Sequence, residues 1–374
     1  IRNSWTDMKI GIDARMFGPR QGGLGRYVEQ LILNLEKTDQ TNDYVIFLNQ
    51  TNFNNYQPQN PRFKKVLAGI KWYGWREQFD LPALIKKSRV DLMHWPHWNV
   101  PFFYRGPFVV TIHDLILIHY PSRVSSTLGP VTYWLKYLVF RFILWHAIVR
   151  AKKIITPSEF TKKDILKHFS VPADKIVVTY EGVGESMAGD DKLSPAVKKP
   201  YMLYVGVAYP HKNLAGLMDA FKIFYEKYSK EYNLILAGPD NYFYRKLKYP
   251  RLFGGQAISY IGFVSDSELR ALYKNASLYV FPSLYEGFGL PGLEALSFGL
   301  PVVAAGNSCL PEILGEAALY FDPRDPEEMA RVISQALKDG NLRVTLAQKG
   351  AKQLGRYQWK KCAQETLQIY KNVL

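Results

Sequence analysis

The sequence predicts an α/β protein made of two doubly wound domains, each with a parallel sheet between layers of helices. Short apolar runs rich in β-branched residues alternate with longer amphipathic stretches in both halves of the chain. Residues 183–200 are poor in apolar pattern, contain Gly, Asp, Ser, Pro and Lys, and read as a linker. A length of 374 residues is typical of two domains, and 47% apolar residues can fill two cores.

The first domain is expected to cover residues 1–182. Its alternation of short and long segments indicates a parallel sheet wrapped by helices. The predicted strands are Lys9–Asp13, Tyr44–Leu48, Val90–Trp95, Phe108–His113, Lys153–Pro157 and Ile176–Glu181, and the clearest predicted helices are Gly25–Lys37 and Arg76–Lys87.

The second domain is expected to cover residues 201–357 and repeats the same alternation. Ser265 and Glu268 are spaced as a capping box, which marks the start of one of its helices. The predicted strands are Tyr201–Val207, Leu234–Ala237, Ser259–Phe263, Leu278–Phe281, Val302–Ala304 and Leu319–Phe321, and the predicted helices are Asn213–Tyr228, Asp266–Asn275, Leu290–Phe298 and Pro326–Lys338.

The net charge of +15 is unevenly distributed along the chain. Residues 1–182 carry 25 Lys and Arg against 14 Asp and Glu, a net +11, and the remaining residues carry 23 against 19, a net +4. A basic first half indicates an anionic partner, which could be a membrane surface, a phosphorylated acceptor or nucleic acid. A basic surface that is merely solvated is the alternative.

The cysteine and histidine content restricts the class of protein further. Only two cysteines are present, Cys309 and Cys362, which argues against a disulfide framework and fits a reducing cytoplasm. No cluster of Cys and His has metal-ligand spacing, so we expect no metal site. No secretory leader is visible.

Residues 286–294 read Glu-Gly-Phe-Gly-Leu-Pro-Gly-Leu-Glu, with one carboxylate in a glycine loop and one in the first turns of a predicted helix. Pro291 suits a first helical position, and a helix N-terminus favours a phosphate. Because carboxylates beside a phosphate would repel it, Glu286 and Glu294 are better suited to accept hydrogen bonds from sugar hydroxyls. The segment therefore predicts a nucleotide sugar, against the alternative of two solvated glutamates around a tight turn.

The longer segment from Phe281 to Ala304, Phe-Pro-Ser-Leu-Tyr-Glu-Gly-Phe-Gly-Leu-Pro-Gly-Leu-Glu-Ala-Leu-Ser-Phe-Gly-Leu-Pro-Val-Val-Ala, resembles the signature of the large retaining glycosyltransferase family 4. The resemblance runs along nearly all of the chain and implies the GT-B fold, in which two Rossmann-like domains face each other across a cleft. By resemblance, Glu294 matches the position that binds the nucleotide ribose, and Glu286 matches the one near the donor sugar. Backbone contacts to the donor would come from Gly287, Phe288, Gly289 and Leu290.

A second glycine loop, Gly22-Gly-Leu-Gly25-Arg-Tyr, follows the first predicted strand and opens a helix. The spacing Gly-x-Gly-x-x-Gly of dinucleotide-binding proteins is absent, and no suitable acid ends the second strand, so an NAD enzyme is disfavoured. In the family, the matching loop lies beside the donor diphosphate and the acceptor. The resemblance assigns Gly23 and Gly25 to the donor side and Gly22 to the acceptor side, against the alternative of a tight turn without a ligand.

Thr111-Ile-His113-Asp114 ends a predicted buried strand, and the carboxyl ends of such strands face the ligand in α/β proteins. A lone histidine is more often structural than catalytic, but a His-Asp pair at this place is better positioned than most. The family has a histidine here near the transferred sugar and the acceptor. We therefore take His113 as a candidate catalytic residue and Asp114 as a candidate on the acceptor side.

The second domain opens with Tyr204-Val-Gly206-Val-Ala-Tyr-Pro-His211-Lys212-Asn213. A glycine turn followed by a lysine at a helix start suits an anionic leaving group, and Lys212 would neutralise the β-phosphate of the donor as the sugar–phosphate bond breaks. The family often adds an arginine soon after the glycine that matches Gly206. That arginine is missing here, and His211 is the only extra basic group in this stretch. By resemblance, Val264 lies in a segment that frames the nucleobase.

The predicted function is that of a retaining, metal-independent glycosyltransferase that moves a hexose to a hydroxyl of a glycan or lipid-linked glycan. The resemblance suggests mannose as the sugar and GDP rather than UDP as the nucleotide, with no other cofactor. The predicted location is the cytoplasm, with a peripheral contact to an anionic membrane through the basic first domain, and we expect no nucleic acid as partner. A nucleotide-sugar epimerase of the same fold, a nucleic-acid-binding protein and a catalytically inactive scaffold are the alternatives. The segment 358–374 resembles the last helix of GT-B proteins, which returns to the first domain.

The stretch Val131–Val149 is strongly apolar but contains charged residues. Spanning a bilayer would place two of its cations near mid-membrane, at about 2.5–3.5 kcal/mol each. We therefore reject a transmembrane helix. Core or interface helices of the first domain are one interpretation, and a membrane-interfacial surface with Trp134 and Trp145 is the other. The stretch 71–76, with two tryptophans and two cations, would extend such a surface.

Overall fold

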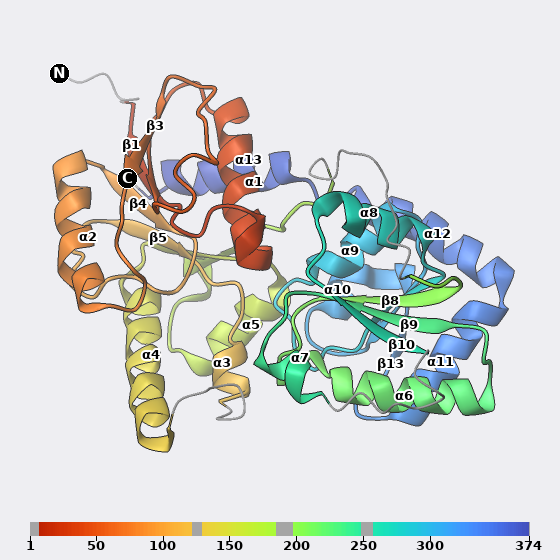
Figure 1. Ribbon diagram of the computed structural model, residues 1–374. Helices are drawn as coiled ribbons and strands as arrows, with labels where there is room; N and C mark the ends of the chain where they lie inside the picture. Colours follow the sequence, from red (N-terminus) through yellow and green to blue (C-terminus); the bar gives the residue numbers. More distant parts are fainter. Residues whose placement is uncertain (1–6, 122–128, 185–196, 248–256, 374) are drawn as a thin grey trace. The chain divides into compact units, whose positions relative to one another are not determined.

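The computed structural model describes residues 7–121, 129–184, 197–247 and 257–373 (Figure 1). Its contacts divide the chain into two compact units, of which the first comprises Ile1–Leu115, Leu128–Gly182 and Trp359–Leu374, and the second Ile116–Thr127 and Val183–Gln358. Residues 116–121 lie in the range expected for the first domain but belong to the second unit, because their contacts are with it. Most of the expected linker, residues 185–196, lies outside the described residues.

The first unit contains a seven-stranded parallel sheet in the order β3-β2-β1-β4-β5-β6-β7. In Figure 1, α1 and α13 cover one face of this sheet and α2 covers the other. The strands are β1 (Lys9–Asp13), β2 (Asp43–Leu48), β3 (Phe63–Leu67), β4 (Leu92–Trp95), β5 (Phe108–Thr111), β6 (Lys153–Thr156) and β7 (Ile176–Val178). The helices are α1 (Gly22–Thr38), α2 (Trp75–Ser88), α4 (Pro130–Arg150), α5 (Glu159–His168) and α13 (Trp359–Lys371).

The edge strand β3 was not predicted from the sequence. Its residues read Phe-Lys-Lys-Val-Leu, and two lysines in the middle of the run hide the apolar pattern. Only Phe63 is buried, and its ring stacks on Tyr44 of β2 with centroids 4.1 Å apart. Lysines on an edge strand are tolerated because one side of the strand faces solvent, and they discourage pairing with another chain.

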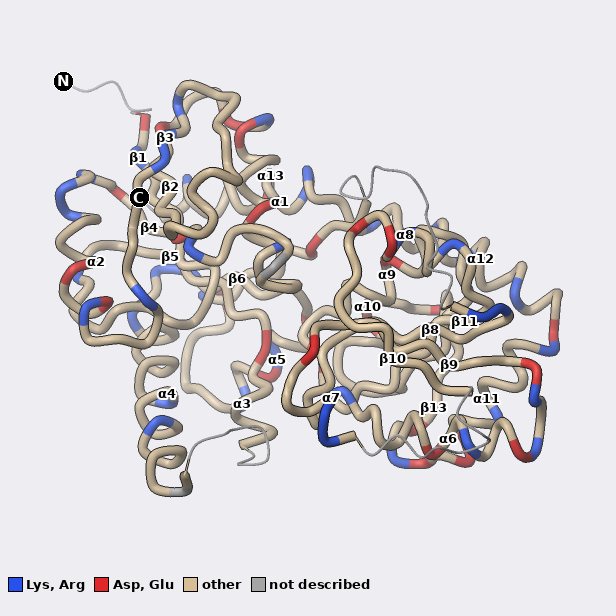
Figure 2. The backbone as a smooth tube through the Cα atoms, in the orientation of Figure 1, with Lys and Arg blue, Asp and Glu red and all other residues tan. Residues whose placement is uncertain are grey.

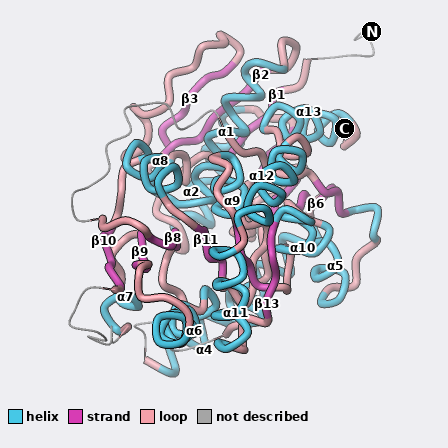
Figure 3. The backbone as a smooth tube through the Cα atoms, turned by 90° about the vertical axis from the view of Figure 1, so that its right-hand side faces the viewer, coloured by secondary structure: helices cyan, strands magenta, loops and turns pink. Residues whose placement is uncertain are grey.

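The second unit contains a six-stranded parallel sheet in the order β10-β9-β8-β11-β12-β13, with helices on both faces (Figure 3). The strands are β8 (Tyr201–Val205), β9 (Asn233–Ala237), β10 (Ile258–Gly262), β11 (Leu278–Phe281), β12 (Val302–Ala305) and β13 (Ala318–Phe321). The helices are α3 (Ile116–His119), α6 (Leu214–Lys227), α7 (Tyr242–Lys246), α8 (Asp266–Asn275), α9 (Leu290–Ser297), α10 (Leu310–Leu314), α11 (Pro326–Lys338) and α12 (Gly340–Leu354).

Two parallel-sheet domains of the Rossmann type confirm the predicted fold class. The capping box at the start of α8 is also confirmed, because Ser265 accepts from the Glu268 N–H and the Glu268 carboxylate accepts from the Ser265 N–H. Helix α12 was missed. Only Leu346 and Gly350 are buried along its 15 residues, so its sequence carries little apolar periodicity. Gly350 packs tightly, since a Cβ there would lie 3.0 Å from the Leu296 side chain of α9.

The order of the strands decides which loops meet. In the first sheet β1, β4 and β5 are neighbours, so the loops that follow them begin at one edge. In the second sheet β8 lies next to β11, which brings the loop at residues 206–213 beside the loop at 282–289. Ligands of open α/β sheets bind at such carboxyl edges.

Candidate active site

The centre of the candidate site in the second unit is an ion pair between Lys212 and Glu286. The Lys212 Nζ lies 2.6 Å from Oε1 and 2.8 Å from Oε2 of Glu286. The Lys212 side chain is 22% exposed and that of Glu286 is 8% exposed, so the pair is largely shielded but reachable from one side. Without a ligand, the lysine charge is therefore neutralised by the carboxylate rather than left open for a phosphate.

Main-chain contacts fix the positions of these two residues. The Leu284 N–H donates to the His211 carbonyl over 2.7 Å, which joins the loop after β8 to the loop after β11. Asn213 has a left-handed backbone with φ of 57°, and its side-chain amide donates to the carbonyls of Pro282 and Pro323. The Glu286 N–H donates to Ser308 Oγ over 3.2 Å. The loops that follow β8, β11, β12 and β13 are thus tied together around the ion pair.

His211 is a neutral side chain at pH 7, which corrects its expected role as an extra basic group. Burial lowers its pKa to about 4, and the adjacent Lys212 charge acts in the same direction, against the opposing effect of Glu286. Its ring stacks with Tyr209, and Tyr120 of the second unit approaches it with centroids 6.2 Å apart. His211 can donate a hydrogen bond to a phosphate, but it does not supply the positive charge of the missing arginine.

The loop from Glu286 to Leu290 is buried throughout and leads directly into α9. Gly289 has a left-handed φ of 96°, and a Cβ there would lie 2.9 Å from Leu310 and 3.2 Å from Phe281. No side chain caps α9, so its first N–H groups keep the partial positive charge of a helix N-terminus. Cys309 Sγ contacts the Phe288 carbonyl at 3.2 Å. The predicted glycine loop and helix start are therefore present together.

Glu294 lies inside α9 and is 7% exposed. The Tyr273 hydroxyl donates to its Oε2 over 3.0 Å. Burial raises the pKa of the Tyr279 phenol, and the nearby negative charges of Glu294 and Glu286 raise it further. Both carboxylates of the signature are thus buried and held by side chains from other elements, Glu286 by Lys212 and Glu294 by Tyr273.

Two further predicted residues border this cluster. Gly206 ends β8, its carbonyl accepts from the Tyr244 hydroxyl over 2.8 Å, and it lies so close to Gly238 that a Cβ on Gly238 would overlap it. Val264 is half-buried in the loop between β10 and α8, next to Gly262 with a left-handed φ of 78°. Both lie at the carboxyl edge of the second sheet, where the family resemblance places the donor nucleotide.

His113 follows β5 of the first unit, two residues after the strand ends, and both of its ring nitrogens are engaged. Nδ1 lies 3.1 Å from Oε1 of Glu181, and Nε2 lies 3.0 Å from the Pro96 carbonyl. Burial alone would lower the pKa of His113, but Glu181, the Pro96 carbonyl and Asp114 outweigh it and raise the pKa. The imidazole links the loops after β4 and β7 through these two contacts. In this arrangement it has no free nitrogen for a proton transfer.

Glu181 was missed as a functional residue by sequence reasoning. It follows β7 and is 4% exposed, and its carboxylate is the partner that holds His113. An acidic residue just beyond the end of a buried strand was the available signal. His113 also meets the Tyr27 ring edge-on, with centroids 4.7 Å apart. Tyr27 belongs to the first turns of α1, so the histidine packs directly beneath the glycine loop.

A buried chain of polar groups supports these residues from below. The Tyr27 hydroxyl lies 3.0 Å from Thr111 Oγ1, which lies 2.8 Å from Nε2 of His94. Nδ1 of His94 lies 2.6 Å from the Tyr370 hydroxyl of α13. Burial, followed by the charge of His113, lowers the pKa of His94 to about 3, so its imidazole is neutral. The chain joins α1, β5, β4 and α13 inside the first unit.

The predicted glycine loop opens α1, which begins at Gly22. Gly22 has a left-handed φ of 64°, and Gly22 and Gly23 are exposed. Gly25 is buried, and a Cβ there would overlap the Gly18 carbonyl and lie 2.8 Å from the Met16 carbonyl. The loop therefore folds back on itself, with its first two glycines open to solvent.

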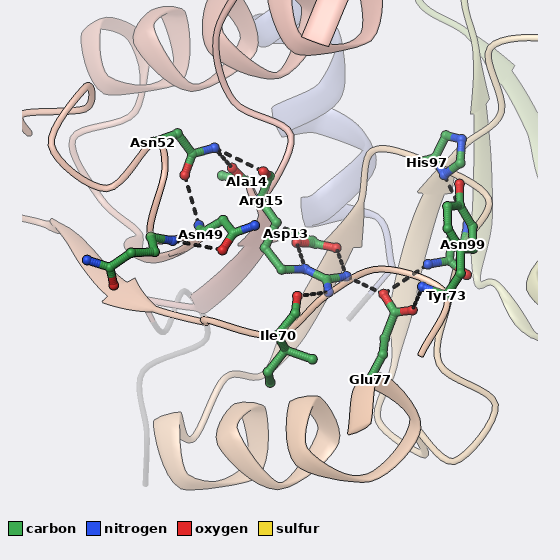
Figure 4. A network of polar contacts seen from close by, with 11 residues as sticks. Asp13, Ala14, Arg15, Asn49, Asn52, Ile70, Tyr73, Glu77, His97 and Asn99 are labelled. Carbon is green, nitrogen blue, oxygen red and sulfur yellow. Dashed lines mark hydrogen bonds and ion pairs between the residues drawn. The ribbon is translucent and has the colours of Figure 1, made fainter. Parts of the chain in front are cut away.

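A second network, drawn in Figure 4, was not anticipated from the sequence. Arg15 is 1% exposed and its guanidinium bonds both oxygens of Asp13 and Oε1 of Glu77. Burial lowers the pKa of Arg15, but the two carboxylates outweigh it and raise the pKa, so the group stays charged. Asn99 also donates to Glu77, and the other Glu77 oxygen accepts from the Tyr73 N–H. The pattern Asp-x-Arg, which begins at the last residue of β1, was the available signal.

This network borders a cavity of about 10 Å³, room for about one water molecule. Its lining comes from α1, from the last residue of β1 and from the loops that follow β1, β3 and β4, and includes Trp72 and His97 beside Asp13, Arg15 and Asn99. The carboxyl edge of the first sheet is therefore polar and fixed by ion pairs, whereas the face of the unit beyond it is aromatic.

Comparison with known proteins identifies the family. The family model "Glycosyltransferase Family 4" matches residues 21–186, and "Glycosyl transferases group 1" matches residues 189–353. The chain is 32% identical to O-antigen chain mannosyltransferase B of Escherichia coli over 292 residues, which cover 75% of this chain and 74% of the relative. The chain belongs to glycosyltransferase family 4.

Other relatives agree with that membership. The family 4 chain is 29% identical to O-antigen chain mannosyltransferase RfbU of Salmonella typhimurium over 269 residues, 71% of this chain and 70% of the relative. The solved structure of Anabaena Alr3699/HepE in complex with UDP-glucose superposes with a TM-score of 0.71 at 18% identity, covering 98% of this chain and all of the other. That likeness confirms the GT-B fold. As a member of this family, the protein is a glycosyltransferase.

Proposed function

We propose that this glycosyltransferase transfers mannose from GDP-mannose to a hydroxyl of a glycan carried on a lipid. Two relatives named as O-antigen chain mannosyltransferases support the sugar and the kind of acceptor. The observation that carries the proposal is the Lys212–Glu286 pair beside the uncapped start of α9. It combines a cation and a helix N-terminus, which suit a diphosphate, with carboxylates, which suit sugar hydroxyls.

The donor diphosphate would be held by Lys212, by the first N–H groups of α9 and by a hydrogen bond from neutral His211. Lys212 must leave Glu286 to reach the β-phosphate, and the freed carboxylate would then accept hydrogen bonds from the sugar. Glu294 would accept bonds from the ribose. Lys212 and the first N–H groups of α9 stabilise the departing diphosphate as its negative charge grows, which is the electrostatic part of catalysis. Because protein groups supply this charge, we propose that transfer needs no metal ion.

Transfer would retain the configuration at the anomeric carbon. The bond from that carbon to the phosphate oxygen breaks, the bond to the acceptor oxygen forms on the same face, and the acceptor proton passes to the leaving phosphate oxygen. A covalent route through a carboxylate, as in retaining glycosidases, needs a free nucleophilic carboxylate at the reacting carbon. In this proposal Glu286, once Lys212 has turned to the phosphate, accepts hydrogen bonds from the sugar hydroxyls and forms no bond to the reacting carbon.

His113 would act by positioning. Its contacts to Glu181 and Pro96 hold the loops after β4 and β7 against the glycine loop through Tyr27. We propose that Gly22 and Gly23, which are exposed at the start of α1, receive the substrates there. We propose a cytoplasmic location on the ground that both cysteines are buried free thiols, as in proteins of reducing compartments.

The test is a transfer assay with GDP-mannose, UDP-glucose and UDP-galactose on a lipid-linked glycan acceptor, with and without EDTA. The expected result is mannose transfer that EDTA leaves unchanged, with the anomeric configuration of the product, read by NMR, equal to that of the donor. Transfer from a UDP-sugar alone would overturn the choice of donor. Loss of transfer with EDTA, restored by a divalent cation, would overturn metal independence, and an inverted product would overturn retention.

A thermal-shift screen with GDP, UDP and ADP separates binding from chemistry. A nucleotide that binds only the folded protein raises its melting temperature by mass action. The proposal predicts the largest shift with GDP, and Lys212→Ala should abolish it while the protein remains folded. Interconversion of a nucleotide sugar without any acceptor would instead identify an epimerase.

A further inference from the structure

Helix α4 of the first unit carries an apolar stripe that faces solvent. Its 21 residues contain Lys136, Arg141 and Arg150 and no acidic residue. From Val131 to Phe142 no side chain is buried. A helix this apolar is normally covered by other protein, so its exposure calls for an explanation.

The exposed apolar residues of α4 recur at helical spacing and share one face. The first is Val131, and the others follow it by 3, 4, 7, 8, 11, 14 and 18 residues, the spacing of a single stripe. Leu135 and Leu138 are each 63% exposed, and Val139 is 54% exposed. We name this set the α4 stripe: Val131, Trp134, Leu135, Leu138, Val139, Phe142, Trp145 and Val149.

Ring contacts extend the α4 stripe onto the neighbouring loops and α2. Phe142 meets Phe102 at 5.2 Å between centroids, and Phe102 meets Phe103 at 5.4 Å. Phe103 stacks in turn on Phe79 of α2 at 4.8 Å, and both of these rings are about half exposed. Arg105 lies over the Phe102 ring at 5.7 Å. The exposed surface is therefore continuous and rich in aromatic rings.

A second line of rings starts from Phe140 of α4. It meets Trp98 at 4.7 Å, and Trp98 meets Tyr73 at 5.7 Å. Tyr73 is 62% exposed and has an unusual left-handed φ of 60°. Glu77, itself fully buried and bound to Arg15, holds that backbone by accepting from the Tyr73 N–H. The buried Arg15–Glu77 ion pair thus holds the backbone that carries the exposed Tyr73 side chain.

The charges around the α4 stripe identify what covers it. On a helical projection the cations of α4 flank the stripe, and Figure 2 shows Lys and Arg but no Asp or Glu along this helix. Tryptophans within the stripe and cations at its border are the composition of helices that lie in the headgroup region of a bilayer. In a two-fold contact between two copies of the chain, the three cations of one α4 would face the three cations of the other, and their repulsion disfavours such a dimer.

We propose that the α4 stripe docks the enzyme on an anionic lipid bilayer, with the helix lying in the plane of the interface. Among the helices that the structure describes, none has the length and hydropathy needed to span a bilayer. The docking surface goes beyond the proposed transfer reaction, and vesicle binding can be measured without any nucleotide or acceptor. Its failure would leave the proposed activity untouched.

The experiment is flotation of the full chain with vesicles of phosphatidylcholine alone or with about one third phosphatidylglycerol, the anionic component that attracts cations. An apolar variant carries Leu135→Gln, Leu138→Gln and Val139→Gln, and a charge variant carries Lys136→Glu and Arg141→Glu. A control variant carries Val344→Gln and Lys222→Glu, which are exposed on helices of the second unit. Folding of each variant is checked by its melting temperature.

The expected result is binding to anionic vesicles only. The apolar variant should bind about 10- to 100-fold more weakly, because three partly inserted side chains become polar. The charge variant should lose at least about fivefold per reversed charge. The control should bind like the wild type, and brominated lipid should quench tryptophan fluorescence less in Trp134→Phe than in the wild type.

Three results would overturn the proposal. The first is no binding of the wild type to anionic vesicles, and the second is equal binding of all variants, which would place the contact elsewhere. The third is a dimer in light scattering that the apolar variant converts to a monomer, which would assign the stripe to a second copy of the chain.

Discussion

Replacing Glu286 by glutamine should strengthen binding of a nucleoside diphosphate while transfer is lost. In the unliganded protein both carboxylate oxygens hold Lys212, at 2.6 and 2.8 Å. A diphosphate therefore has to displace the carboxylate from the lysine and lie beside its negative charge. Glutamine has the same shape but no charge, so Glu286→Gln releases the lysine. Transfer should fall because the proposed contact of the carboxylate with the donor sugar is lost.

The magnitude follows from the geometry of the pair. A hydrogen bond to a charged group contributes about 1.5–3 kcal/mol, so freeing one such donor for the phosphate should raise GDP affinity about tenfold, or about 1.4 kcal/mol. Because the Glu286 side chain is only 8% exposed, losing its charge should also lower the free energy of unfolding by about 2 kcal/mol. For a domain of about 150–250 residues, the size class of the second unit, that corresponds to a melting temperature lower by about 4–8 °C.

Titration calorimetry with GDP and thermal unfolding measure the two effects. The matched control is Glu327→Gln, since Lys227 bonds both oxygens of Glu327 at 2.8 and 2.9 Å on the surface of the same unit. That pair is more than half exposed on both sides, so its loss should leave both stability and GDP binding unchanged. Unchanged or weaker GDP binding by Glu286→Gln would refute the competition between the carboxylate and the diphosphate.

Three further predictions concern single residues. Gly25→Ala should lower the melting temperature by several degrees and reduce activity, because the new Cβ overlaps backbone atoms. At Gly69 a Cβ meets open space, so Gly69→Ala should be neutral, and equal melting temperatures of the two variants would contradict the prediction. Arg15→Met should lower the free energy of unfolding in urea by about 3–5 kcal/mol, whereas Arg76→Met on the surface should lower it by less than about 0.5 kcal/mol. Similar losses in the two variants would disprove the stabilising role of the buried network. Because the folded pKa of His211 is about 4, below its ordinary 6.5, the unfolded chain takes up a proton first as the pH falls. The free energy of unfolding should therefore fall as the pH drops below 6.5, by about 2 kcal/mol more at pH 5 than in His211→Gln. Parallel curves of unfolding free energy against pH for the two proteins would exclude this contribution of His211.

Much of the second domain could be predicted because its signals are local. The helix at Pro326–Lys338 coincides with α11, and the strand at Leu278–Phe281 coincides with β11. The glycine loop that ends in α9 was recognised from nine consecutive residues. Such features depend on periodicity, caps and backbone freedom, which neighbouring residues determine among themselves.

The exposure of α4 was left open by its sequence. An apolar stretch of this length fits a buried helix as well as an interfacial one, because periodicity cannot say what lies opposite a face. The structure decides between them: Ile143 and Leu144 are buried, whereas Leu135 and Leu138 remain exposed. Strand β3 was missed for the opposite reason: its lysines break the apolar pattern, yet the segment pairs with β2 at the edge of the sheet.

By itself, the sequence determined two doubly wound domains, the glycine loops and the residue types of the site, because each is encoded within a few neighbouring positions. Only the tertiary structure decided which groups meet. Lys212 and Glu286 are 74 residues apart, His113 and Glu181 are 68 apart, and Arg15 and Glu77 are 62 apart. Each pair depends on how separate elements pack, as when β8 is placed next to β11. Strand order arises from packing the whole sheet, so no local pattern contains the partner of a charged side chain.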